Sequence, residues 1–172
     1  ALLEVCLESP VTLPVLAMTR VNNFYEGMPH SLRQLKGHRK IIGLTAYDYP
    51  MARVLSGADV DFLLVGDSLG MVVYGDPTTH FVTLQEMIRH TQAVVRGHTR
   101  GLVVADMPLG TYETPEEALK NVRNLMNETD VKAVKLEGSA IVCQTLVEAG
   151  IAVMGHTGLK PQQAERWKIQ GQ

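Results

Sequence analysis

The stretch GLVVADM at 101–107, followed by TPEEALKNVRNLMNE at 114–128 and KAVKLEG at 132–138, determines the fold class. The first and third segments are short and mostly apolar, as strands covered on both faces are. The middle segment has helical periodicity, and Thr114 before Pro115 predicts where that helix begins. Strand, helix and strand in this order predict a βα repeat with parallel strands.

The same alternation of short apolar runs and amphipathic stretches continues on both sides of this unit, from about Lys40 onward. A helix is expected at 83–97, where Thr83 and Glu86 form a capping box, and a shorter one at 139–148. Strands are expected at 41–48, 61–68, 101–107, 132–138 and 151–156. The chain is therefore expected to fold as an α/β protein with a parallel sheet.

Composition limits the function classes. A chain of 172 residues with 45% hydrophobic residues can form one core. We expect a catalytic domain over 40–172 and an N-terminal extension of unknown role over 1–39. The net charge of -2 and the aromatic fraction of 5% argue against a nucleic-acid partner.

The cysteine count and the opening residues indicate the compartment. Cys6 and Cys143 are too few for a disulfide framework, so a reducing, cytosolic setting is expected. The opening stretch 1–18 is interrupted by Glu and Pro well short of the ~20 apolar residues of a membrane span. No membrane partner is expected.

Polar residues follow the apolar part of every expected strand. They are Tyr47 and Asp48, Asp67 and Ser68, Asp106, Lys135 and Glu137, and His156. In a βα barrel the loops after all strands converge on one face, whereas an open doubly wound sheet binds its ligand in one crevice. The spread of polar residues over successive strands favours the barrel, with an active site at this face.

Two aspartates at neighbouring strand ends suggest a cation. Asp67 and Asp106 would repel one another unless a cation or a shared proton relieved them, although each alone could simply cap a loop. Oxygen ligands from Asp67, Asp106 and Glu137, without a His or Cys cluster, suit Mg²⁺ better than Zn²⁺. We therefore expect a magnesium site with these three residues.

Two further residues are candidates for binding a substrate. Lys135 lies two residues before Glu137, so both side chains point to one face of a strand, and its ammonium group could stabilise an oxyanion. A plain ion pair between Lys135 and Glu137 is the alternative. His156 is expected to contact substrate, with a structural histidine that hydrogen-bonds a loop as the alternative.

Several motifs resemble the ketopantoate hydroxymethyltransferase family, in matching order and spacing from about Lys40 to the C-terminus. They are TAYDYPMA at 45–52, LLVGDSLGMVVYG at 63–75, TLQEMIRHTQAVVRG at 83–97, VVADMPLGTYETPEEA at 103–118, AVKLEG at 133–138 and MGHTGLKPQ at 154–162. The resemblance implies a (βα)₈ TIM barrel of the phosphoenolpyruvate/pyruvate superfamily. It also implies a cytoplasmic homo-oligomer, commonly a decamer.

The resemblance further implies an activity. The enzyme transfers a hydroxymethyl group from 5,10-methylenetetrahydrofolate to 3-methyl-2-oxobutanoate, giving 2-dehydropantoate (ketopantoate) for pantothenate and coenzyme A biosynthesis through a Mg²⁺-stabilised enolate. Asp67 and Asp106 correspond to the metal-binding aspartates and Glu137 to the acidic residue near the metal. Ser68 and Lys135 match the contacts to the 2-oxo acid.

Three departures from the family pattern bear on these expectations. A barrel of this kind needs at least ~200 residues, so we expect it to be truncated after about five strands. The catalytic base of the family is a glutamate on a later strand, and no residue of this chain matches it. The stretch 161–172 is shorter than the corresponding family loop, so the folate contacts are not assigned.

Three alternative functions stay open at this stage. One is another carbon–carbon lyase or mutase of the same superfamily, which shares the Mg²⁺ and enolate chemistry. A second is a serine esterase with Ser68 of the GDSL motif at 66–69 as nucleophile, although His156 has Val153 three residues earlier where such enzymes have Asp. A third is a catalytically silent fragment.

Overall fold

The computed structural model describes residues 32–98 and 101–162. The predictions made for the opening stretch, for Cys6, for most of the N-terminal extension and for residues 163–172 lie outside these residues.

The strands form one parallel sheet. They are β1 (Gly43–Thr45), β2 (Phe62–Val65), β3 (Leu102–Asp106), β4 (Ala133–Leu136) and β5 (Ala152–Gly155). Their order in the sheet is β1-β2-β3-β4-β5, and all neighbours are parallel. A doubly wound sheet reverses its strand order at a switch point, whereas a barrel winds in one direction. The sequential order therefore confirms the βα-barrel arrangement over five units, and each expected strand is present in a shorter form.

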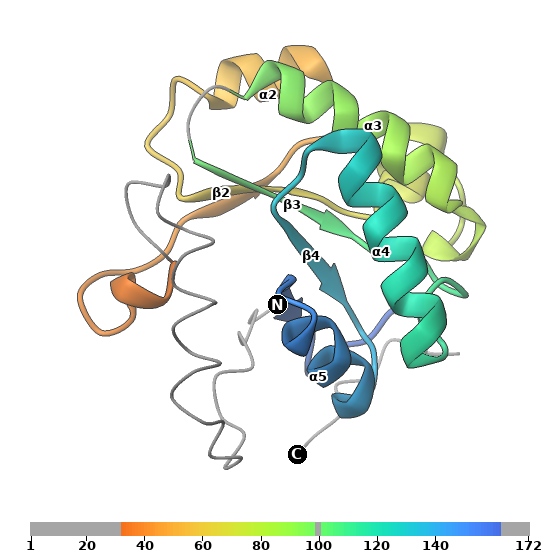
Figure 1. Cartoon of the computed structure of the whole chain (residues 1–172). Helices are drawn as coiled ribbons and strands as arrows, with labels where there is room; N and C mark the ends of the chain where they lie inside the picture. Colours follow the sequence, from red (N-terminus) through yellow and green to blue (C-terminus); the bar gives the residue numbers. More distant parts are fainter. Residues whose placement is uncertain (1–31, 99–100, 163–172) are drawn as a thin grey trace.

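Helices follow the strands and cover one side of the sheet. They are α2 (Tyr49–Leu55), α3 (Leu84–Gly97), α4 (Pro115–Thr129) and α5 (Ala140–Glu148), with the short helical segments η1 (Leu32–Leu35), η2 (Gly70–Tyr74) and η3 (Thr79–Phe81). Figure 1 shows α2, α3, α4 and α5 succeeding one another around the outside of the strands.

The helix starts that the sequence predicts are confirmed. Thr83 and Glu86 form the capping box of α3, and the Thr114 side chain accepts a hydrogen bond from the Glu117 backbone at the start of α4. Ser139 caps α5 in the same way. These side chains satisfy backbone N–H groups that have no partner within the helix.

Asp48 and helix α2 differ from the prediction. Asp48 was expected at the polar end of a strand, but its side chain accepts a hydrogen bond from the Met51 backbone at 2.7 Å and caps α2. The strand is shorter than expected because the chain turns into this helix directly after Tyr47. A helix of only seven residues gives too few turns for its periodicity to stand out.

The strand residues alternate between two apolar layers. Leu63, Val65, Val103, Ala105, Val134 and Leu136 belong to the large core that also includes the helix residues. The intervening positions form a smaller cluster on the opposite face, made of Phe62, Leu102, Val104, Ala133 and Met154. Because side chains alternate along a strand, the odd and even positions of each strand are assigned to different layers. The second face is the inner face of the barrel arrangement.

Strand β1 is more exposed than predicted. All three of its residues are exposed, including Leu44 at 42%. Within residues 32–98 and 101–162, β1 pairs with β2 alone. An edge strand lacks a neighbour on one side, so side chains that a central strand would bury stay accessible.

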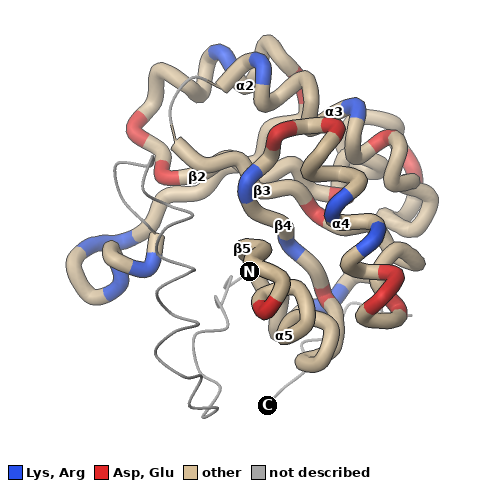
Figure 2. The backbone as a smooth tube through the Cα atoms, in the orientation of Figure 1, with Lys and Arg blue, Asp and Glu red and all other residues tan. Residues whose placement is uncertain are grey.

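Charged residues of both signs occur along α3 and α4, as Figure 2 shows. Among the described residues, no helix is long and apolar enough to span a membrane.

The close contact between α2 and α3 generates a stability prediction. A Cβ added at Gly97 would lie 2.7 Å from the Tyr49 carbonyl oxygen and 2.8 Å from the Ala52 Cβ. Gly97→Ala should therefore lower the free energy of unfolding by about 1–3 kcal/mol, although Ala has the higher helix propensity. Urea denaturation measures this change.

Gly57→Ala is the matched control, because the added Cβ would meet only the Val54 carbonyl oxygen at 3.5 Å. Equal stability of the Gly97 and Gly57 variants would show that α2 does not pack on α3 as described.

Candidate active site

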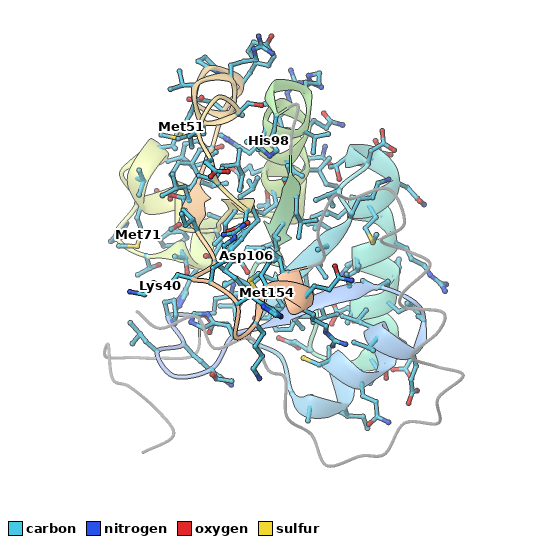
Figure 3. The ribbon with its side chains drawn as sticks, turned by 90° about the vertical axis from the view of Figure 1, so that its left-hand side faces the viewer. Lys40, Met51, Met71, His98, Asp106 and Met154 are labelled. Carbon is cyan, nitrogen blue, oxygen red and sulfur yellow. The ribbon has the colours of Figure 1, made fainter. Side chains whose placement is uncertain are left out.

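The inner face of the sheet changes from apolar to charged toward the carboxyl ends of the strands. Asp106 lies two residues after Val104, Lys135 two after Ala133, and His156 two after Met154, so each side chain continues its inner apolar layer. Figure 3 shows Asp106 within the interior of the fold. The charged groups therefore lie on top of an apolar layer, away from bulk water.

Asp106 and Lys135 form a buried ion pair. They are direct neighbours in the parallel register of β3 and β4, where adjacent strands are about 4.8 Å apart. Lys135 Nζ donates a hydrogen bond to Asp106 Oδ2 at 2.6 Å, and the two side chains are only 7% and 2% exposed. The partner of Lys135 is thus a carboxylate on the neighbouring strand, and not Glu137 of its own strand as the sequence alternative had it.

Asp67 lies in the loop after β2 and is held by a residue that the sequence did not single out. Gln162 Nε2 donates to Asp67 Oδ2 at 2.6 Å and to the Met107 carbonyl oxygen at 3.0 Å. The Tyr112 hydroxyl donates to Gln162 Oε1. Both residues lie in the stretches that resemble the family, but neither an amide nor a phenol indicated a role by residue type.

Burial shifts the pKa values of these groups. Burial raises the pKa of Asp106 to about 7, against the opposing effect of the Lys135 charge. Burial also raises the pKa of Asp67, which the hydrogen bond from Gln162 opposes. Tyr112 has a raised pKa for the same reason, with a further contribution from the charge of Glu137. The charges of Asp67 and Glu137 also raise the pKa of Asp106, and the charge of Glu137 also raises the pKa of Asp67.

The arrangement of the carboxylates bears on the expected metal. Within residues 32–98 and 101–162, no group of three or more His, Cys, Asp or Glu side chains is arranged to hold a metal ion. The expected set of Asp67, Asp106 and Glu137 is therefore not assembled as a three-ligand group. Asp106 Oδ1 is nevertheless buried without a hydrogen-bond partner among the described residues. Two aspartates and solvent or substrate oxygens fit Mg²⁺, which usually binds one or two carboxylates and keeps waters.

Ser68 and His156 have different partners. The Ser68 hydroxyl and the Tyr47 hydroxyl are hydrogen-bonded at 3.0 Å. His156 Nδ1 lies 3.2 Å from Glu137 Oε1, a contact that is an ion pair only when the imidazole is protonated. In the described part of the chain the partner of Ser68 is thus a tyrosine and not the histidine that a serine nucleophile requires.

Comparison with known proteins identifies a matching family and similar relatives. The family described as ketopantoate hydroxymethyltransferase matches residues 28–172. The 3-methyl-2-oxobutanoate hydroxymethyltransferase of Rhodospirillum rubrum is 56% identical over 126 residues, which are 71% of this chain and 45% of that protein. The protein of that name from Pyrobaculum aerophilum is 55% identical over 132 residues, 74% of this chain and 50% of that protein. The chain spans about half the length of the curated relatives it matches.

Solved structures support the fold. The 2,3-dimethylmalate lyase, a PEP mutase/isocitrate lyase superfamily member, matches 78% of this chain and 51% of its own with a TM-score of 0.53 at 18% identity. Phosphonopyruvate hydrolase, solved in complex with oxalate and Mg²⁺, matches 62% of this chain and 37% of its own with a TM-score of 0.51 at 11% identity. At these identities the likeness concerns the fold and not the reaction.

The raised pKa of Asp106 predicts a pH dependence of stability. Between pH 3.8 and about 7 the unfolded chain ionises this carboxyl while the folded chain keeps its proton. In this pH range folding is accompanied by the uptake of one proton by Asp106. The stability that this carboxyl contributes is therefore complete below pH 3.8 and is lost as the pH rises to about 7. Asp106→Asn should flatten the fall in melting temperature over this window, measured in a metal chelator.

Asp59→Asn, at an exposed position, is the control and should leave the wild-type pH profile unchanged. A profile for Asp106→Asn that parallels wild type would contradict the raised pKa.

Proposed function

The chain belongs to the ketopantoate hydroxymethyltransferase family, and we propose that its residues form the metal- and oxo-acid-binding part of a hydroxymethyltransferase. The proposed reaction transfers a hydroxymethyl group from 5,10-methylenetetrahydrofolate to 3-methyl-2-oxobutanoate and gives 2-dehydropantoate, as in pantothenate biosynthesis. The proposal rests on relatives of that name and on one structural observation. Asp67, Asp106 and Lys135 are gathered at one end of the inner sheet face, buried above an apolar layer.

Asp67 and Asp106 are the proposed Mg²⁺ ligands, with Glu137 as the acidic residue close to the metal. They come from the ends of neighbouring strands, and their mutual repulsion in a buried site favours a bound cation. When bound, Mg²⁺ supplies a Lewis acid for the carboxylate and 2-oxo oxygens of the oxo acid.

Lys135 is proposed to stabilise negative charge on the substrate oxygen. Its ammonium group is buried, so its field is not screened by water and acts strongly on a nearby oxyanion. Ser68 is proposed to donate a hydrogen bond to the substrate carboxylate, with its hydroxyl oriented by Tyr47. His156 is proposed to contact the substrate from the end of β5, where its Nδ1 lies 3.2 Å from Glu137 Oε1.

The group that removes the C3 proton is not assigned within this chain, and neither are the folate contacts. The cytoplasmic location and the homo-oligomer, expected as a decamer, remain proposals from the family resemblance.

Removal of Asp67 tests the metal site. In the full-length protein, Asp67→Ala should weaken Mg²⁺ binding by about 10-fold or more, because one of the two proposed carboxylate ligands is lost. Calorimetric titration with MgCl₂ measures the dissociation constant. Asp59→Ala, an exposed aspartate, should bind as wild type does. Unchanged affinity in Asp67→Ala would make Asp67 a loop-capping residue instead.

Removal of the Lys135 charge tests the chemistry. Deuterium exchange at C3 of 3-methyl-2-oxobutanoate reports proton removal without folate. With Mg²⁺ in D₂O, the full-length enzyme should exchange this proton, and Lys135→Met should slow exchange by about 100-fold because an oxyanion partner is lost. NMR follows the loss of the C3 proton signal.

Lys132→Met is the matched control, because Lys132 is exposed just before the same strand. Exchange in Lys135→Met within twofold of the control would exclude a role of Lys135 in enolisation. A wild-type enzyme that exchanges no faster than a Mg²⁺ blank would contradict the enolate mechanism itself.

A further inference from the structure

The segment after β5 reaches back across the carboxyl ends of the strands. β5 and β2 are separated in the sheet by β3 and β4, yet Gln162 hydrogen-bonds Asp67, the residue that follows β2. One residue earlier, the Pro161 carbonyl oxygen lies 3.2 Å from His80 Nε2 of η3. A carbonyl oxygen can only accept, so His80 donates. Two successive residues thus connect the end of β5 to the loop after β2.

The hydrogen bonds of Gln162 determine which way its amide faces. The atom that faces Asp67 and the Met107 carbonyl must be the nitrogen, because both partners are acceptors. A rotated amide would direct its oxygen at two acceptors at once. The Tyr112 hydroxyl donates to the amide oxygen, so both amide protons and the oxygen are engaged. Gln162 is 3% exposed, and water does not compete for these bonds.

Tyr112 supports this amide from the opposite side. Its hydroxyl is buried, and its ring lies beside Gly138, directly after β4, where an added Cβ would lie 3.4 Å from Tyr112 Cδ2. The chain of contacts runs from the end of β4, through Tyr112 and Gln162, to the carboxylate after β2. This path links the proposed metal ligand Asp67 to a strand that is not its neighbour in the sheet.

We propose that Gln162 is a positioning residue for Asp67, holding Oδ2 of the carboxylate so that the group keeps one orientation toward the cation site. The inference rests on the proposed function for the identity of that cation. Asp67 lies beyond the last residue of β2, where strand geometry no longer determines its direction. A side-chain hydrogen bond must therefore supply the orientation, as the partners of metal-binding carboxylates commonly do.

Gln162→Met tests the proposal, because methionine has nearly the same length and shape but no amide. Mg²⁺ titration of the full-length protein by calorimetry at 25 °C should show a dissociation constant raised by about 10-fold or more. Tyr112→Phe removes the hydroxyl that holds the amide and should raise it by a smaller factor, roughly two- to tenfold. Circular dichroism at 25 °C establishes that each variant is folded.

Gln144→Met is the matched control, since Gln144 is exposed on α5 and its amide donates a hydrogen bond to Glu148. This variant should bind Mg²⁺ as wild type does. Unchanged or tighter binding in a folded Gln162→Met variant would overturn the proposal, and tighter binding would show that the amide competes with the cation. If Gln162→Met does not fold, an unchanged affinity in Tyr112→Phe overturns it.

A crystal structure of metal-free Gln162→Met separates this inference from the proposed function. The Asp67 carboxylate should adopt another side-chain rotamer once the amide is absent, and an unchanged rotamer would overturn the proposal. This readout holds even where wild type binds no Mg²⁺, a result that would contradict the proposed function alone.

Discussion

The candidate site depends on the parallel register between β3 and β4. That register makes Asp106 and Lys135 direct neighbours on the inner face, where the distance between strands is short enough for an ion pair. A shift by one residue would move Lys135 to the face that packs against the helices, where Val134 and Leu136 now lie. The apolar layers on both faces thus preserve the register, and the register preserves the site.

Burial strengthens the electrostatic effect of these charged groups. It also carries a free-energy cost, because each charge is removed from water. A carboxylate and an ammonium group removed from water are stabilised only by close partners, and Asp106 has Lys135 for one oxygen and no hydrogen-bond partner among the described residues for the other. The raised pKa of Asp106 is the consequence. A site in which buried carboxylates repel one another is suited to a cation, because the cation attracts each carboxylate and offsets their repulsion.

Much of the fold could be predicted from local signals. Thr83, Thr114 and Ser139 begin three helices for reasons contained within four residues of sequence. The apolar runs predicted all five strands, although not their lengths. The exposure of β1 could not be predicted, because it depends on which strands lie beside it. Asp48 was misassigned because an aspartate at a strand end and one at a helix start have the same residue type.

The sequence by itself determined which chemistry is available: aspartates, a glutamate, a lysine and a histidine at the ends of successive apolar strands, in motifs that identify a family. The tertiary structure alone decided the partners. Lys135 pairs with Asp106 because the register decides which residues of two strands are neighbours. The sequence of one strand does not reveal that register. Gln162 reaches Asp67 across 95 positions because the segment after β5 crosses the strand ends, a contact between residues that local sequence patterns cannot relate.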